Sequence, residues 1–159
     1  MPRKRAWVEY IEHRYGTALS RHDGQVELEA LTATQSEVEL IKYHMVLHEA
    51  FRAGEPILVY KGRFGGYFIV DGHTRARVEW DKGMKIIFAS IYTSSDPFVP
   101  EELSRIAIDT GGGRQRHVWE VPVVDRVGQG TPAWEVRKRE LLEEWQAEMQ
   151  ARPPFEPRP

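Results

Sequence analysis

Tyr67-Phe68-Ile69-Val70-Asp71-Gly72-His73-Thr74-Arg75-Ala76 passes from an apolar run directly into a polar segment. The run that ends at Val70 has the composition of a buried strand. Ala76 and Trp80 lie four residues apart, the spacing of one helix face, and Gly83 follows as a helix stop. Gly72 stands between the two, where glycine permits a backbone turn that a side chain would block. The stretch therefore predicts a strand, a tight turn and a helix over residues 74–82.

Further apolar runs flank this unit on both sides. Residues 56–60 are an expected strand, and the glycine-containing turn over residues 61–66 predicts a β-hairpin with residues 67–70. After the helix, residues 86–92 are the clearest strand pattern in the chain. This order of strands and helix predicts an α+β fold, a small mixed sheet with helices.

Periodicity and turn residues also predict the outer elements. Before the hairpin we expect a helix over residues 5–15, a turn at His22-Asp23-Gly24, a strand over residues 25–29, and a helix capped by Thr34 or Ser36 that runs to about Ala53. Later in the chain we expect a helix over residues 100–108, an edge strand over residues 117–124, and a helix from Pro132 to about Gln150.

These elements divide the chain into four parts. Residues 1–24 form an N-terminal helical extension, and residues 25–95 form the core. Residues 96–151 form a C-terminal extension packed on the core and ending in a long helix. Residues 152–159 are rich in proline, which predicts a disordered tail.

The composition excludes several classes of protein. The 159 residues include 22 Lys and Arg against 24 Asp and Glu, a formal charge of −2, and no cysteine. Disulfide scaffolds, thiolate-bound zinc, iron–sulfur clusters and cysteine nucleophiles are therefore excluded. No apolar run approaches the roughly 18 residues that a membrane span needs, so we expect no membrane partner and a cytoplasmic protein. The near-neutral charge argues against a broad nucleic-acid surface but leaves room for a local basic site.

The junction at Gly72 has the chemistry of a phosphate site. The first turn of a helix leaves amide N–H groups unpaired and carries the positive end of the helix dipole. Thr74 adds a hydroxyl, Arg75 a guanidinium, and His73 a donor or a general base. Asp71 could accept from a substrate hydroxyl or hold Mg²⁺ against phosphate oxygens. An ordinary solvated turn uses the same residue types, so that interpretation stays open.

The sequence around this junction is locally basic. Between Lys61 and Lys85, six Lys and Arg side chains stand against three Asp and Glu side chains, a local +3 within a chain of −2. This bias favours an anion site near Gly72.

The run from Tyr67 to Ala76 resembles the signature of the ParB/sulfiredoxin superfamily, in particular that of its small ParB-like members. The resemblance extends through residues 56–60, Gly83 and residues 86–92, and it covers roughly residues 26–92. It implies a ParB/sulfiredoxin-like core in which the strand–Gly–x–x–Arg–helix element binds nucleotide phosphates.

By this resemblance, the phosphates of ATP, ADP or CTP would contact Gly72, His73, Thr74 and Arg75. In an enzyme of this kind, Asp71 and His73 would be the catalytic residues, and Asp71 would hold Mg²⁺. His73 would orient a phosphate or shuttle a proton, and Arg75 would neutralise phosphate charge.

The chain departs from the superfamily at two informative positions. Sulfiredoxins have a cysteine where His73 stands, so sulfinic-acid repair is excluded. Free serine kinases of the superfamily usually read Asp-Gly-His-His-Arg, and here Thr74 replaces the second histidine. Their acidic residue after the first strand corresponds to Gln35, while Glu29 and Glu37 are out of register as substitutes.

Two function classes therefore stay open. The first is a nucleotide-dependent phosphotransferase or nucleotide hydrolase that acts on a small-molecule acceptor. The second is a non-enzymatic, nucleotide-dependent adaptor that binds DNA or a protein through the basic N-terminus, residues 111–116 or the last helix. The residues after Tyr92 predict no helix-turn-helix domain of the kind that true ParB proteins use for DNA, and no carboxylate cluster supports a nuclease.

Two other patterns have both a structural and a functional interpretation. His44 and His48 lie four apart on one expected helix and could share a metal, although two histidines leave its coordination incomplete. The last helix carries a stripe of large apolar side chains, which is typical of core packing or of a homodimer contact. The stripe consists of Trp134, Leu141, Trp145 and Met149.

Overall fold

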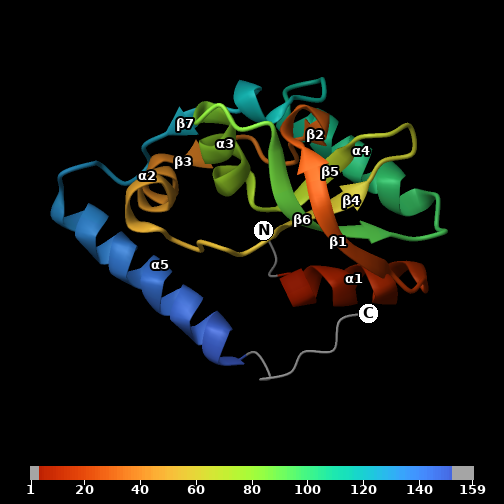
Figure 1. Cartoon of the computed structure of the whole chain (residues 1–159), viewed down its shortest axis with the longest axis horizontal. Helices are drawn as coiled ribbons and strands as arrows, with labels where there is room; N and C mark the ends of the chain where they lie inside the picture. The colour runs from red at the N-terminus through yellow and green to blue at the C-terminus, as the bar shows by residue number, and fades with distance from the viewer. Residues whose placement is uncertain (1–3, 152–159) are drawn as a thin grey trace.

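A five-stranded mixed sheet lies at the centre of the computed structural model, which describes residues 4–151 (Figure 1). Across the sheet the strands are β1 (Ser20–Glu27), β6 (Ile86–Thr93), β4 (Ile57–Lys61), β5 (Tyr67–Asp71) and β2 (Leu31–Thr32). β6 is antiparallel to β1 and parallel to β4, and β5 is antiparallel to β4 and parallel to β2. The expected α+β fold with a small mixed sheet and a β4–β5 hairpin is confirmed.

Helices cover both faces of this sheet. α3 (His73–Asp81) packs on one face, and α1 (Lys4–Tyr15) and α4 (Phe98–Thr110) pack on the other. The expected helices over residues 5–15, 74–82 and 100–108 correspond to these three elements. No helix among residues 4–151 is long and apolar enough to cross a membrane.

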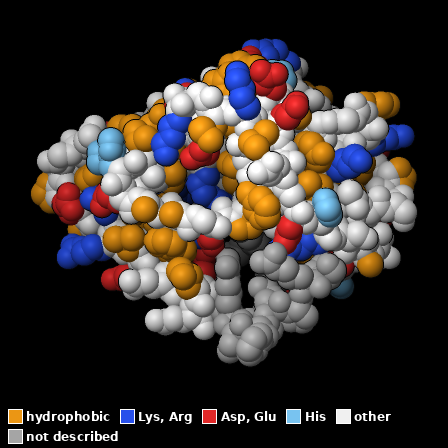
Figure 2. Space-filling model, in the orientation of Figure 1, with side chains coloured by type: hydrophobic (Ala, Val, Ile, Leu, Met, Phe, Trp, Pro, Cys, Tyr) orange, Lys and Arg blue, Asp and Glu red, His pale blue; other side chains and the backbone are white. Residues whose placement is uncertain are grey.

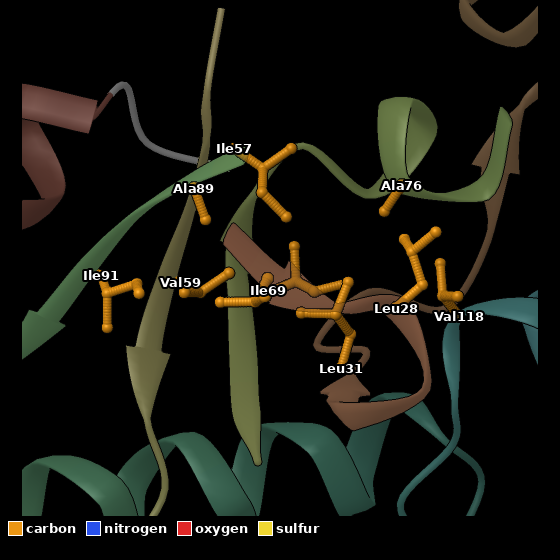
Figure 3. Close-up of a cluster of buried hydrophobic side chains, with 10 residues drawn as sticks. Leu28, Leu31, Ile57, Val59, Ile69, Ala76, Ala89, Ile91 and Val118 are labelled. Carbon is orange, nitrogen blue, oxygen red and sulfur yellow. The ribbon is translucent and has the colours of Figure 1, made fainter. Parts of the chain in front are cut away.

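The central strands are buried on both faces, which explains their uninterrupted apolar sequence. Successive side chains of a strand point to opposite sides, so Ile57 and Val59 pack toward α3 while Leu58 and Tyr60 pack toward α1 and α4. Figure 3 shows the cluster on the first side, where side chains of the sheet gather with Ala76 of α3.

Two further helices pack against each other beside the sheet. α2 (Leu40–Glu49) packs against α5 (Pro132–Ala151), which is the outermost helix in Figure 1. The expected apolar stripe of α5 faces inward at Trp134 and Leu141, which are buried, and at Trp145, whose ring meets that of Phe51 edge-on. The stripe therefore packs within the chain, and only its last member, Met149, is exposed.

Three aromatic rings stack beside the last turn of α3. The ring of Trp80 lies 4.3 Å from that of Trp119 at 21°, and the ring of Trp119 lies 4.4 Å from that of His117 at 3°. This aromatic ladder connects α3 to the segment that precedes β7 (Val123–Val124).

The predicted turn at His22-Asp23-Gly24 is wrong, because β1 runs straight through it. Asp23 is in register with Ser90 and Gly24 with Ala89 of β6. All eight residues of β1 pair with β6, and this pairing outweighs the local turn preference of Asp23-Gly24. The sheet therefore includes residues 20–24, which the sequence assigned to the N-terminal extension.

The predicted helix from Thr34 or Ser36 to Ala53 is too long at both ends. Val38 and Glu39 form β3, a short strand parallel to β7, and α2 begins only at Leu40. The helix ends before Ala50, whose φ of 54° places it in the left-handed region.

The predicted edge strand over residues 117–124 is mostly wrong as well. Val118–Glu120 is a 3-10 turn, and only Val123 and Val124 pair as a strand. The expected tail, residues 152–159, lies outside the described residues.

Candidate functional site

The junction between β5 and α3 is built around Gly72. Its φ is +113°, in the region that favours glycine, and a Cβ at this position would lie 2.4 Å from Cγ2 of Ile57. The backbone therefore passes close to β4 as it turns from strand to helix. The helix starts immediately, with the amide of Ala76 donating to the carbonyl of Gly72 over 2.9 Å.

Among the described residues, the first turn of α3 leaves three backbone amide groups without a hydrogen-bond partner. Within residues 4–151, no acceptor receives a hydrogen bond from the backbone N–H of His73, Thr74 or Arg75. Such amides, together with the positive end of the helix dipole, are the usual protein contribution to a phosphate site. Gly72 and the half-buried Thr74 lie at this turn, and their predicted contacts with phosphate stay predictions.

His73 is turned into the protein. Its Nε2 accepts a hydrogen bond from the backbone N–H of Thr34 over 2.9 Å, and the residue is buried. Burial lowers the pKa of His73 to about 3, so the ring is neutral at physiological pH. In this arrangement His73 holds two segments of chain together, and its predicted catalytic role stays a prediction.

Arg75 is also turned inward. Its Nη1 donates to the carbonyls of Glu55 and Pro56 over 2.8 and 3.2 Å, and its Nη2 lies 3.3 Å from Oδ2 of Asp71. Burial lowers the pKa of Arg75, while the charge of Asp71 opposes this shift. The guanidinium thus ties the first turn of α3 to the segment before β4, and its predicted contact with phosphate stays a prediction.

Asp71 is the carboxylate nearest to this turn in sequence. Its side chain is 32% exposed, and its Oδ2 faces Arg75. One exposed carboxylate next to phosphate oxygens is a common way to hold Mg²⁺, which otherwise keeps its waters. Residues 4–151 contain no group of three or more acidic or histidine side chains that could hold a metal by itself. The residues fit Mg²⁺ only as a companion of bound phosphate.

Positive charge is not concentrated around Gly72, contrary to the sequence-based expectation. Arg77 pairs with Asp81 and Lys82 with Glu79, as Arg75 does with Asp71. The other basic residues of the segment lie elsewhere, on the β4–β5 turn and before β6. Figure 2 likewise shows acidic and basic side chains interspersed on the face it presents.

Thr34 is the residue of this junction that sequence reasoning misplaced. It was expected to cap a helix, but its N–H binds His73 and its hydroxyl donates to the carbonyl of Ile69 over 2.5 Å. The only signal for it was its place next to Gln35, where the resemblance puts an acidic residue.

The possible substitutes for that acidic residue are occupied or distant. Gln35 donates through its side-chain amide to the carbonyl of Glu37, and the carboxylate of Glu37 pairs with Arg126. Glu29 is exposed on the turn after β1. No carboxylate of these residues is brought into the junction.

A small hollow opens next to the Thr34–His73 contact. It has a volume of about 200 Å³ and lies between β5, α1 and α4. Its walls include Trp7, Tyr10, Thr34 and Val70. The hollow is mainly apolar, with aromatic rings from α1 on one side.

His44 and His48 are adjacent on α2, with ring centroids 4.6 Å apart. The ring of His44 also meets that of Trp134 edge-on, so this pair takes part in the packing of α5. No third ligand completes a metal site within the described residues.

No family model and no curated protein sequence matches the chain. Among solved structures it is similar to protein Atu1540 from Agrobacterium tumefaciens, with 13% identity and a TM-score of 0.47 over 81% of this chain and 87% of that one. It is also similar to a Pnob8-like ParB-N domain, with 14% identity and a TM-score of 0.37 over 84% of this chain. The chain spans 48% of that second structure. These similarities assign no ligand or activity to the chain.

Proposed function

We propose that the chain binds a nucleotide, ATP, ADP or CTP, with its phosphates at the first turn of α3. The observation that carries this proposal is the set of three backbone amides of residues 73–75, which have no partner in the part of the chain that the structure describes, with Thr74 at the same turn. The inward contacts of His73 and Arg75 fix this turn before any ligand arrives. A turn held in this way loses little conformational entropy on binding.

Mg²⁺ would be held by Asp71 together with the phosphate oxygens, and it would supply neutralisation of phosphate charge. The Asp71–Arg75 contact keeps the carboxylate next to the first turn of α3. The base or sugar would enter the hollow that Thr34 lines, since its aromatic walls suit a flat ring.

The nucleotide serves one of two purposes. As a phosphotransferase or nucleotide hydrolase, the protein would use Asp71 either to hold Mg²⁺ against the phosphates or to orient the acceptor hydroxyl. As an adaptor, it would bind the nucleotide without turnover. The neutral, buried His73 favours the adaptor, because its Nε2 accepts from the amide of Thr34 and its pKa is lowered to about 3, so it would not take up a proton near neutral pH.

Titration calorimetry with ATP, ADP and CTP, with and without Mg²⁺, tests the common premise. Thr74→Val keeps the side-chain shape and removes the hydroxyl, so we expect affinity to fall about tenfold, the value of one good hydrogen bond to a charged group. Thr110→Val is the matched control, because Thr110 lies at the far end of another helix. Tripolyphosphate should compete with the nucleotide.

The absence of a binding signal with every nucleotide would contradict this proposal. Equal affinity of the Thr74→Val variant and the wild type would contradict it as well. If binding is found, phosphate release with and without candidate acceptors separates enzyme from adaptor. Asp71→Asn should abolish turnover in the first case. Gel-shift measurements at two salt concentrations test the DNA partner, because contacts to DNA phosphates weaken as salt rises.

A further inference from the structure

The turn of the β4–β5 hairpin presents a large apolar side chain to solvent. Phe64 is 96% exposed at the tip of this turn, which projects beside α4 in Figure 1. Gly65 and Gly66 follow with φ values of +86° and +70°, a backbone conformation that would be strained in a residue with a side chain. The chain passes through these two glycines from the turn into β5. An isolated exposed phenyl ring is ordinary, but this one stands next to a cavity.

The cavity lies between the hairpin turn and α4, and its volume is about 460 Å³. Its apolar lining includes Phe68 of β5, and Pro100 and Ile108 of α4. On the α4 side, the hydroxyl of Ser104 is already engaged by the side-chain amide of Gln115 over 2.8 Å. The lining is mixed, because Thr32, Arg105 and Gln115 also line the cavity, and its apolar part can take one aromatic ring.

The rim of the cavity carries charges of both signs. Arg63 is exposed and its guanidinium lies 5.8 Å from the centroid of the Phe64 ring, while no carboxylate within residues 4–151 pairs with it. Glu101 is also exposed, and its pair with Arg105 along the same helix is long, at 3.4 Å. The exposed ring of Phe64, the cavity, two arginines and one carboxylate thus share one small patch.

We propose that this patch binds a second copy of the chain in a two-fold symmetric dimer. A two-fold contact requires a surface that is complementary to itself. This patch contains both an exposed ring and a cavity, and both a cation and a carboxylate. Phe64 of each chain enters the cavity of the other, and Arg63 faces the partner's Glu101. The ring is buried at the centre of the contact, and the ion pairs lie at its rim.

The rim of the cavity offers both partners of an ion pair. Arg63 and Arg105 line it together with Glu101, so a surface of the same composition can match it. A second copy brings one cation for that carboxylate and one carboxylate for Arg63. The apolar stripe of α5 is largely used within the chain, so it offers less surface for the same purpose.

Sedimentation equilibrium over a wide range of concentrations tests the proposal. The wild-type mass should rise from 18.4 kDa toward twice that value as concentration increases. Phe64→Ser should raise the dissociation constant at least about tenfold, because it removes the central anchor. Phe88→Ser is the matched control, since Phe88 is 51% exposed on β6, outside the patch, and should leave the dimer intact.

Charge reversal gives a second, independent test. Arg63→Glu and Glu101→Arg should each weaken the dimer, and the two together should restore it, because each rim pair is then reversed rather than broken. A wild type that stays monomeric at its highest soluble concentration would overturn the proposal. So would a dimer unaffected by Phe64→Ser, or a monomer that instead binds poly-glutamate or single-stranded DNA through Phe64.

Discussion

The backbone N–H of Thr34 donates to Nε2 of His73 over 2.9 Å, joining residues 39 positions apart. The same threonine binds Ile69 through its hydroxyl, so the segment after β2 is fixed to both β5 and the start of α3. An acceptor Nε2 requires an unprotonated nitrogen. The position of the first turn of α3 is thereby linked to the charge state of one buried ring.

This link predicts that acid destabilises the protein through His73. Its pKa is about 3 in the folded chain against 6.5 as the ordinary value, so the contribution is present above 6.5 and is lost as pH falls toward 3. Within that window the free energy of unfolding should fall by about 1.4 kcal/mol per pH unit. Urea denaturation at several pH values measures the slope.

His73→Gln provides the comparison for this measurement. Glutamine offers an acceptor oxygen to Thr34 but does not titrate, so the variant should show a slope shallower by about that amount, with all other groups unchanged. Equal slopes for the two proteins would show that His73 is not the titrating group.

Gly72→Ala should be strongly destabilising. The new Cβ would lie 2.4 Å from Ile57 and would impose a φ of +113° on a residue with a side chain. Strain and overpacking together should cost about 3 kcal/mol or more. Gly112→Ala has positive φ but no atom within 4 Å, so it should cost only about 1 kcal/mol. Similar losses in the two variants, measured by urea denaturation, would rule out the close approach to β4.

Arg75→Met should lower stability whether or not nucleotide is present. It removes the donor to the carbonyls of Glu55 and Pro56 and leaves Asp71 without its cation. We expect a loss of about 2–4 kcal/mol in thermal or chemical unfolding. Arg105→Met, at a side chain that is 71% exposed, should change stability by less than about 0.5 kcal/mol. An unchanged Arg75 variant would mean that the guanidinium is free to serve a ligand.

Trp134→Ala should test the role of α5. Trp134 is only 4% exposed and packs in the α2–α5 cluster, so its truncation should cost about 3–5 kcal/mol. Val136→Ala, on the outer side of α5 and 44% exposed, should be nearly neutral. If Trp134→Ala instead leaves stability intact and changes the molar mass, α5 is a dimer contact and not part of the folded unit.

The central elements were predictable because their signals are local. The strand–Gly72–helix unit, the hairpin before it and β6 each show continuous apolar runs or a helical period within one window of sequence. β3 and β7 gave no such signal, because each has two residues and pairs with a segment about 85 positions away. Contacts of that kind are set by tertiary packing, which also extended β1 through Asp23-Gly24.

The candidate site was predictable in place but not in detail. The inward turn of His73 and Arg75 depends on Thr34 and Glu55, which lie far away in the sequence. The distribution of charge, in contrast, had a readable signal. Arg77 and Asp81 are four apart on α3, a spacing at which opposite charges pair along a helix, and Asp71 pairs with Arg75 from the end of β5 at the same spacing.

The stacked rings of Trp80 and Trp119 give the protein an intrinsic circular-dichroism signal. Two indoles in contact couple their electronic transitions, and the resulting split circular-dichroism band changes with their separation and angle. Trp80 belongs to the same nine-residue helix whose first turn forms the candidate site. A ligand that moves α3 relative to Trp119 should therefore change this band without a label.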